Sequence, residues 1–288
     1  ILTHSTKTQA KRRIFMLGCF LKAIKLSGKK VVWTVHNIQG HEADHPRLQQ
    51  QLNELLFAEV NGFISLNNEG LKLIKDNARQ RKSQKFAYIP HPTYKGYYEN
   101  DIGRAEARRR LKVSPDQKVF LFIGQIRKYK NVSGLIEAFK ALDLPGKLLI
   151  IAGKVHEELL IEVMNAVANH SDIMLHNQFI EDPELQVFLN ASDLVVNPYT
   201  HIFNSGSIFL NLSFHKPTLV PNKGTFIELE KDLGPQLVML YDGAITASHL
   251  EEAMLKTAKQ TSAREVEMDH LDPEFIARQT LKFYESLL

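Results

Sequence analysis

The residues best suited to chemistry in this sequence follow the apolar run KVFLFI and read GQIRKYKN from position 124 to 131. A glycine at a strand end lets the backbone turn without a Cβ clash, so Gly124 marks the start of a loop. Arg127 and Lys130 then lie at the strand's carboxyl end, where open α/β sheets bind ligands. This pattern favours a phosphate-binding loop. The alternative is that both cations are solvated charges on an ordinary strand-to-helix connection.

A second segment with binding chemistry follows the predicted strand end NPY at 197–199. Its candidate ligand-binding residues are Asn204, Ser205, Gly206 and Ser207. The pattern places a helix start at the glycine, where the unpaired amides of the first turn attract anions and the serine hydroxyls add uncharged donors. Ser205 could instead serve only as the N-cap. Together with the basic loop, this helix start would supply the two point charges and oriented amides that a nucleotide diphosphate needs.

The N-terminal part offers candidates for proton transfer. His36 ends the apolar run VVWTV, and Glu42 follows in the next loop. A histidine at a strand's carboxyl end could position a substrate or take a proton from a hydroxyl group, and Glu42 could do the latter. His36 and Asn37 could instead merely cap the strand. Three histidines and two carboxylates cluster here, but their spacing fits no closed zinc site and no cysteine accompanies them, so we predict no metal. These residues are His36, His41, Glu42, Asp44 and His45.

Regular alternation of strands and helices begins near position 118. The strands are continuous Val/Ile/Leu runs, which are typical of a parallel sheet covered by helices on both faces. The sequence therefore predicts a doubly wound α/β domain. Predicted strands lie at 118–124, 147–153, 172–178, 193–199, 217–221 and 237–242, with helices at 131–142, 156–169, after 183 and from 206.

The N-terminal part repeats this pattern in a shorter form. Predicted strands lie at 29–37, 62–67 and 85–90, with helices at 46–59 and 69–78. The segment IPHPTYKGYYENDIG is rich in proline, glycine and tyrosine and reads as an interdomain connection. We predict a partial N-terminal domain at 1–95, a connection at 96–116, a second domain at 117–271 and a C-terminal helix at 272–288. The expected apolar face of that helix comprises Phe275, Ile276, Leu281 and Tyr284.

The amino-acid composition limits which classes of protein this chain could belong to. The 288 residues are 44% hydrophobic and 24% charged, as in a globular protein of about two domains. The net charge of +4 is slight, so no nucleic-acid partner is predicted. The single cysteine, Cys19, is expected to be a small buried residue, and this usage fits a cytoplasmic protein. No segment is long enough to cross a bilayer.

The basic stretch at 7–30 allows two interpretations. It could be an amphipathic helix lying against anionic lipid at the inner face of a membrane, which would suit a lipid-linked substrate. The favoured interpretation is a core helix that precedes a strand and holds its lysines and arginines in water.

Four segments together resemble a known family. GQIRKYKNVSGLIEAF, KLLIIAG, FIEDPELQVFLNASDLVVNPY and NSGSIFLNLSFHKPTLVP are similar to the nucleotide-sugar-binding domain of GT-B glycosyltransferases of the family 4/group 1 type, found in bacterial polysaccharide and glycolipid assembly. WTVHNIQGHE is similar to the family's acceptor-domain strand and loop. The resemblance implies two Rossmann-like domains facing a cleft, with the N-terminal domain incomplete here by roughly 70–100 residues.

The resemblance also assigns roles to residues. It implies that His36 lies at the donor sugar, that Glu228 meets the nucleotide sugar, and that the loop at 179–181 contacts base and ribose. Two departures stand out: Gln125 and Asn131 replace the family's arginine and last glycine in the basic loop, and Ile202 and Leu210 stand where many retaining members carry glutamates.

The expected function is transfer of a sugar from a UDP- or GDP-sugar to a glycan or glycolipid acceptor, with no cofactor and no metal. A truncated chain of this kind could be inactive. The alternative is a non-catalytic nucleotide-sugar-binding or scaffold protein of the same fold, which the two departures favour. A nicotinamide-dependent oxidoreductase is disfavoured, because no GxGxxG opens the first helix of the second domain.

Overall fold

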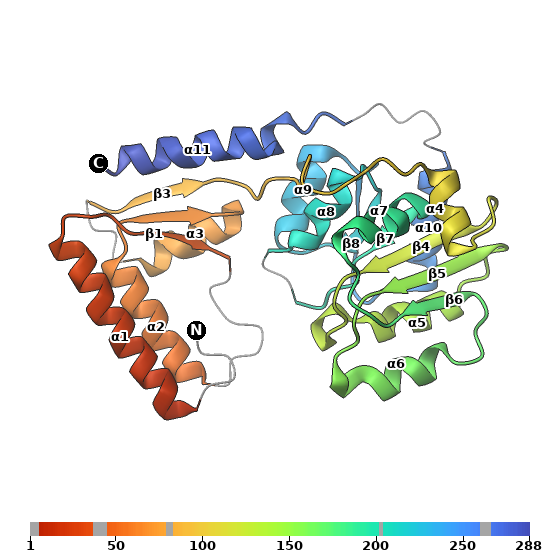
Figure 1. Cartoon of the computed structure of the whole chain (residues 1–288), viewed down its shortest axis with the longest axis horizontal. Helices are drawn as coiled ribbons and strands as arrows, with labels where there is room; N and C mark the ends of the chain where they lie inside the picture. The colour runs from red at the N-terminus through yellow and green to blue at the C-terminus, as the bar shows by residue number, and fades with distance from the viewer. Residues whose placement is uncertain (1–5, 37–44, 79–82, 202–203, 260–265) are drawn as a thin grey trace. The chain divides into compact units, whose positions relative to one another are not determined.

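The computed structural model describes residues 6–36, 45–78, 83–201, 204–259 and 266–288. The chain forms two compact units, the first made of residues 1–91 and 274–288, the second of residues 92–273 (Figure 1). Both contain parallel sheets with helices, which confirms the α/β class. The segment predicted as an interdomain connection contains a helix that its sequence did not indicate, α4 (Arg104–Leu111), and it belongs to the second unit.

The first unit contains a parallel sheet of order β1-β2-β3, formed by β1 (Val32–Val35), β2 (Gly62–Ser65) and β3 (Lys85–Tyr88). Successive side chains of a strand point to opposite faces. On one face Phe63 stacks on Phe57 of α2 (Pro46–Glu59), with ring centroids 5.7 Å apart, and shares a core with Ile74 of α3 (Asn68–Asn77). On the other face Ile64 packs with Ile276 of α11 (Pro273–Ser286).

Helix α11 uses a different face from the one predicted. Ile276 is buried, as expected, but Leu281 and Tyr284 are 58% and 43% exposed. The side chains that reach the sheet are instead Phe283 and Leu287, both of which lie against Gly62. The buried positions lie seven and eleven residues apart, which is one stripe of a helix.

Helix α1 (Lys7–Leu26) packs on α2 by one side only, in a small core where Ala10 meets Leu48 and Leu52. Its other side leaves Phe15 and Phe20 71% and 62% exposed. Cys19, expected to be buried, is exposed. Of the helices that the structure describes, none combines the length and apolar character that crossing a bilayer requires.

The second unit is built on a six-stranded parallel sheet of order β6-β5-β4-β7-β8-β9. Its strands are β4 (Lys118–Ile123), β5 (Lys147–Ala152), β6 (Ile173–His176), β7 (Leu194–Val196), β8 (Thr218–Pro221) and β9 (Val238–Tyr241). Every predicted strand of this part is present. Its further helices are α5 (Val132–Lys140), α6 (Leu160–Val167), α7 (Asp182–Ala191), α8 (Gly206–Ser213), α9 (Thr225–Leu233) and α10 (Ala247–Ala258).

Helices cover both faces of this sheet (Figure 1). Phe120 and Phe122 of β4 join one core with Phe139 of α5, whereas Leu121, between them, joins a second core with Phe188 of α7. This alternation explains why the strand reads as an uninterrupted apolar run. From β4 the chain adds β5 and β6 on one side and then returns to add β7, β8 and β9 on the other side. The boundary between β4 and β7 is therefore the topological switch point, at which such sheets bind ligands.

Candidate functional site

A cavity of about 560 Å³ lies at the carboxyl edge of the six-stranded sheet, the edge formed by residues that follow the strands. Loops after β4, β5 and β6 and the first turn of α8 all contribute to it. Its lining comprises Tyr94, Tyr98, Ile123, Gly124, Gln125, Gly153, Lys154, Phe179, Ile180, Leu185, Gly206, Ser207 and Leu210. The structure thus brings together the two predicted segments and the predicted loop at 179–181.

Two glycines form the floor of this cavity, where the ends of β4 and β5 meet. Gly124 and Gly153 have φ of +125° and +150°, a backbone conformation that side chains disfavour. A Cβ on Gly153 would lie 2.1 Å from the carbonyl oxygen of Gly124. Only glycine fits there, and the two loops therefore touch through their backbones. The amide of Ile126 extends this contact by donating to the carbonyl of Lys154 at 2.9 Å.

Lys130 lies beside this floor. Its Nζ is 3.2 Å from the position that a Cβ of Gly124 would take, and 5.6 Å from the centre of the Tyr199 ring. Burial, and then the charge of Arg127, lower the pKa of Lys130 to about 8. Among the described residues no carboxylate forms an ion pair with its ammonium group. The local field therefore favours an anion.

Arg127 is half-buried and its Nε donates to the side-chain oxygen of Gln125 at 3.1 Å. Gln125 stands where the family resemblance led us to expect an arginine, and here it accepts a hydrogen bond from Arg127. Since Arg127 lowers the pKa of Lys130 through its charge, the two cations act on the same region.

The start of α8 contributes Gly206 and the hydroxyl-bearing Ser207 to the cavity wall, whereas Ser205 is buried behind it. Ser205 is the N-cap residue by position, but its side chain makes no capping hydrogen bond. Its Oγ lies 3.3 Å from the Oγ of Ser207, which in turn is 2.8 Å from the hydroxyl of Tyr199. Burial raises the pKa of Tyr199, so this hydroxyl stays protonated. Gly206 is exposed at the cavity wall and allows a ligand close to the backbone.

The other predicted residues are distributed more widely. Asn204 precedes the helix start and is half-buried, and Glu228, in the first turn of α9, is half-buried and does not line the cavity. His36 is exposed directly after β1, in the first unit. Glu42 lies outside the described residues, as do His41, Asp44 and Ile202.

Sequence reasoning missed several lining residues. Gly153 and Lys154 repeat the signal of Gly124, a glycine after an apolar run, and could have been found by it. Tyr94 and Tyr98 come from the segment before α4; the hydroxyl of Tyr94 lies 3.2 Å from where a Cβ of Gly206 would be. Leu210, at one of the two positions where the family resemblance led us to expect a glutamate in retaining members, forms an apolar part of the wall.

Comparisons with known proteins identify the family of this chain and its fold. A family model described as glycosyl transferases group 1 matches residues 103–259. A curated relative, GDP-mannose:glycolipid 4-beta-D-mannosyltransferase of Xanthomonas campestris pv. campestris, is 26% identical over 252 residues, which are 87% of this chain. The chain spans 66% of that relative's length.

Solved structures share the fold. Anabaena HepE in complex with UDP matches with a TM-score of 0.73 at 15% identity, over 95% of this chain and 77% of that one. WaaG, a glycosyltransferase involved in lipopolysaccharide biosynthesis, matches with a TM-score of 0.67 at 13% identity, over 99% of this chain and 84% of that one. These neighbours confirm the GT-B fold.

Proposed function

Because this chain belongs to the group 1 glycosyl transferases, we propose that it acts in transfer of a sugar from a nucleotide diphosphate sugar to a glycan or lipid-linked acceptor. The observation that carries the proposal is the cavity lined by Gly124, Gly153 and the start of α8, with the ammonium group of Lys130 beside Gly124 although Lys130 does not itself line the cavity. Each supplies a different means of holding a diphosphate: close backbone approach, oriented amides and a point charge.

The reaction would use these groups as follows. As the bond to the sugar breaks, the departing diphosphate gains negative charge. Cations and amides already in place stabilise that charge more in the transition state than in the bound substrate. Lys130 and Arg127 would neutralise it without a metal or a cofactor, while Ser207 and the amides of α8 would donate hydrogen bonds to the phosphate oxygens.

The base and ribose would lie beside the loop after β6. Ile180 and the exposed ring of Phe179 provide an apolar surface there, and Lys154 provides a donor. Glu228 remains a proposed nucleotide-sugar contact. His36 and Glu42 remain the proposed residues for positioning the donor sugar and accepting the acceptor's proton.

We propose a GDP-sugar as the first donor to test, because the curated relative is named for GDP-mannose. A UDP-sugar is the competing donor, since a structural neighbour was solved with UDP. A glycolipid is the first acceptor to test, on the same relative's name.

The deciding experiment is a calorimetric titration of the chain with GDP and with UDP, without added metal. We expect micromolar binding of one nucleotide, lost in the Arg127→Ala/Lys130→Ala variant. Binding that survives this double substitution, or no binding of either nucleotide, would contradict the proposed diphosphate site. A parallel transfer assay with GDP-mannose and a glycolipid acceptor tests catalysis separately.

A second function has one observation in its favour. Leu210 makes the cavity wall apolar at a position where many relatives carry a glutamate. A non-catalytic nucleotide-sugar-binding or scaffold protein would tolerate this change. Nucleotide binding without transfer would favour it.

Peripheral contact with the cytoplasmic face of a membrane is a further proposal, and it would suit a lipid-linked acceptor. It is supported by α1, which exposes Phe15 and Phe20 among basic residues. Co-sedimentation with phosphatidylglycerol vesicles, but not with phosphatidylcholine vesicles, is expected; a Phe15→Ser/Phe20→Ser variant should lose it.

A further inference from the structure

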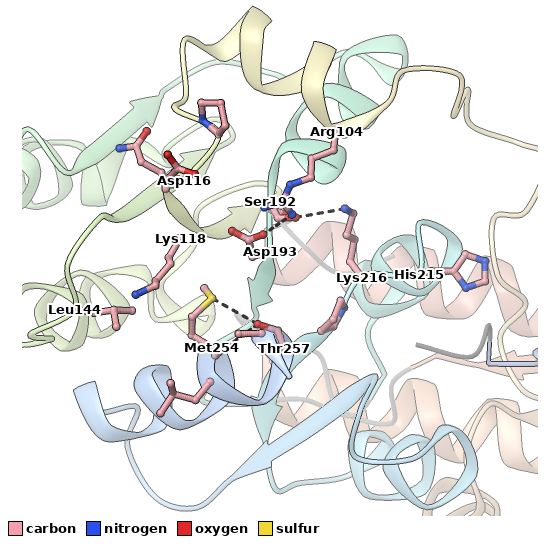
Figure 2. A pocket seen from close by; sticks show the side chains of 15 residues that line it. Arg104, Asp116, Lys118, Leu144, Ser192, Asp193, His215, Lys216, Met254 and Thr257 are labelled. Carbon is pink, nitrogen blue, oxygen red and sulfur yellow. Dashed lines mark hydrogen bonds and ion pairs between the residues drawn. The ribbon is translucent and has the colours of Figure 1, made fainter. Parts of the chain in front are cut away.

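A second cavity, of about 520 Å³, lies at the amino edge of the six-stranded sheet, the edge formed by residues that precede the strands. Figure 2 shows its lining, which comes from the start of α4, the residues before β4, β7 and β8, and the end of α10. Because all strands are parallel, this cavity is at the opposite edge from the proposed nucleotide site. The function proposed above does not involve it.

Asp193, just before β7, is a half-buried carboxylate that lines this cavity. Its Oδ1 pairs with Arg104 at 2.5 Å, and its Oδ2 accepts from Arg108 and from the amide of Val119, both at 2.8 Å. The side chain of Arg108 is only 3% exposed. Both carboxylate oxygens are therefore already engaged, and Asp193 has little capacity to neutralise another cation.

Lys216, just before β8, is that other cation. Its Nζ has one long contact, 3.4 Å to the carbonyl oxygen of Ser192, which Figure 2 shows beside Asp193. Burial, and then the charge of Arg104, lower the pKa of Lys216 to about 8, against the opposing effect of Asp193. The field at this ammonium group is thus net positive, although a carboxylate is close by.

Arg104 and Lys118 add cationic surface to the same cavity. The side chain of Arg104 is 53% exposed, so its guanidinium keeps a face available beyond its contact with Asp193. Within the described part of the chain, the ammonium group of Lys118 has only a long hydrogen bond, 3.4 Å to the carbonyl oxygen of Pro145. The remaining wall is largely apolar and includes Leu144, Met254 and Leu255.

We propose that this cavity binds a small organic phosphate, with the phosphate group between Lys216 and Arg104 and the organic part against Met254 and Leu255. Ammonium and guanidinium groups together offer the several donors that phosphate oxygens accept. A bare phosphate ion would leave most of the volume and all of the apolar wall unused.

The test uses phenyl phosphate as probe, on the full chain carrying Arg127→Ala/Lys130→Ala so that the nucleotide site cannot contribute. We expect binding by calorimetry, weakened at least about tenfold by a further Lys216→Met substitution. Lys140→Met, at the end of α5, replaces a half-buried lysine outside this cavity; it is the matched control and should leave the affinity unchanged. Inorganic phosphate alone should bind more weakly than phenyl phosphate.

Three results would overturn the proposal: no binding of phenyl phosphate, equal binding by the Lys216→Met variant, or equal affinity for inorganic phosphate. Circular dichroism melting of each variant separates loss of binding from loss of fold. Failure here leaves the nucleotide site untouched, because GDP and UDP binding is measured on the unsubstituted chain.

The affinity should also fall as the pH rises from about 7 to about 9, as the ammonium of Lys216 loses its proton. The charged or titratable side chains around it are those of Arg104, Arg108, Asp193, Lys118, Asp116 and His215. In the Lys216→Met variant this pH dependence should disappear.

Discussion

The two edges of the six-stranded sheet each hold a half-buried lysine whose pKa is lowered to about 8, Lys130 at the carboxyl edge and Lys216 at the amino edge. They differ in what surrounds the lysine. Lys216 lies near a network of paired charges, in which Arg108 donates to Asp193 and to four backbone carbonyls. Lys130 has a second cation, Arg127, as its charged neighbour and aromatic rings as its walls.

The comparison distinguishes a charged group that stabilises the fold, Arg108, from one that is available to a ligand, Lys130. The guanidinium of Arg108 ties the end of α4 to the residues before β4 and β7, so its removal would leave buried acceptors unpaired. Removal of the Lys130 ammonium would leave no described acceptor unpaired. Substitution of Arg108 should therefore affect stability most, whereas substitution of Lys130 should affect ligand binding most.

The largest expected effect is on stability at the amino edge. Arg108→Met should lower the free energy of unfolding by about 3–5 kcal/mol, because it removes a buried donor from four backbone carbonyls and from the half-buried carboxylate of Asp193. Urea denaturation measures this. Arg109→Met, which removes an exposed ion pair with Glu106 on the same helix, is the control and should change little. If both variants lost similar free energies of unfolding, the hydrogen bonds of Arg108 would contribute no more to stability than an exposed ion pair does.

The next effect is on binding at the carboxyl edge. Lys130→Met should weaken nucleotide diphosphate binding about 100-fold, equivalent to about 2.7 kcal/mol, while the free energy of unfolding stays the same or rises. Calorimetry and urea denaturation on one preparation give both values. A large loss of stability together with the loss of binding would contradict the conclusion that Lys130 serves ligand binding rather than the fold.

A smaller effect concerns pH. A lysine whose pKa is about 8 when folded and near 10.5 when unfolded binds fewer protons in the folded state between these values. Stability should therefore rise with pH from about 8 to about 9.5, by about 1 kcal/mol after allowance for solvent screening. The rise should shrink in Lys130→Met and shrink further in Lys130→Met/Lys216→Met. A flat profile in the unsubstituted chain would argue against both lowered pKa values.

The smallest effect on stability is expected at the start of α8. In Gly206→Ala the new Cβ would lie 3.2 Å from the hydroxyl of Tyr94, which must shift by only a few tenths of an ångström. The free energy of unfolding should change by less than about 1 kcal/mol, whereas nucleotide affinity should fall about tenfold if a phosphate approaches this backbone. Unchanged affinity would place the phosphate elsewhere in the cavity.

The sequence predicted the carboxyl edge better than the amino edge, for a physical reason. Strand ends at this edge carry local signals: an apolar run, a glycine and then cations or hydroxyls, as at Gly124 and Ser205. The second unit's sheet was predictable in the same way, since its strands are buried on both faces. The fold class followed from these runs.

The amino edge has no comparable local signal. RAEARRRL, the sequence of α4, lies in the segment predicted as a connection, and only Asp193, 85 residues further on, provides the partner with which Arg108 is buried. The face of α11 was mispredicted for a related reason. Gly62, far away in the sequence, provides the gap that Phe283 and Leu287 fill.

The position of α11 has a consequence for the order of events during protein synthesis. The second unit is continuous in the chain, whereas the first unit needs residues 274–288 to cover one face of its sheet. A ribosome makes those residues only after the whole second unit. The sheet of β1, β2 and β3 therefore emerges first but completes its packing last, and until then Ile64 and Ile89 stay open to chaperones or to wrong partners.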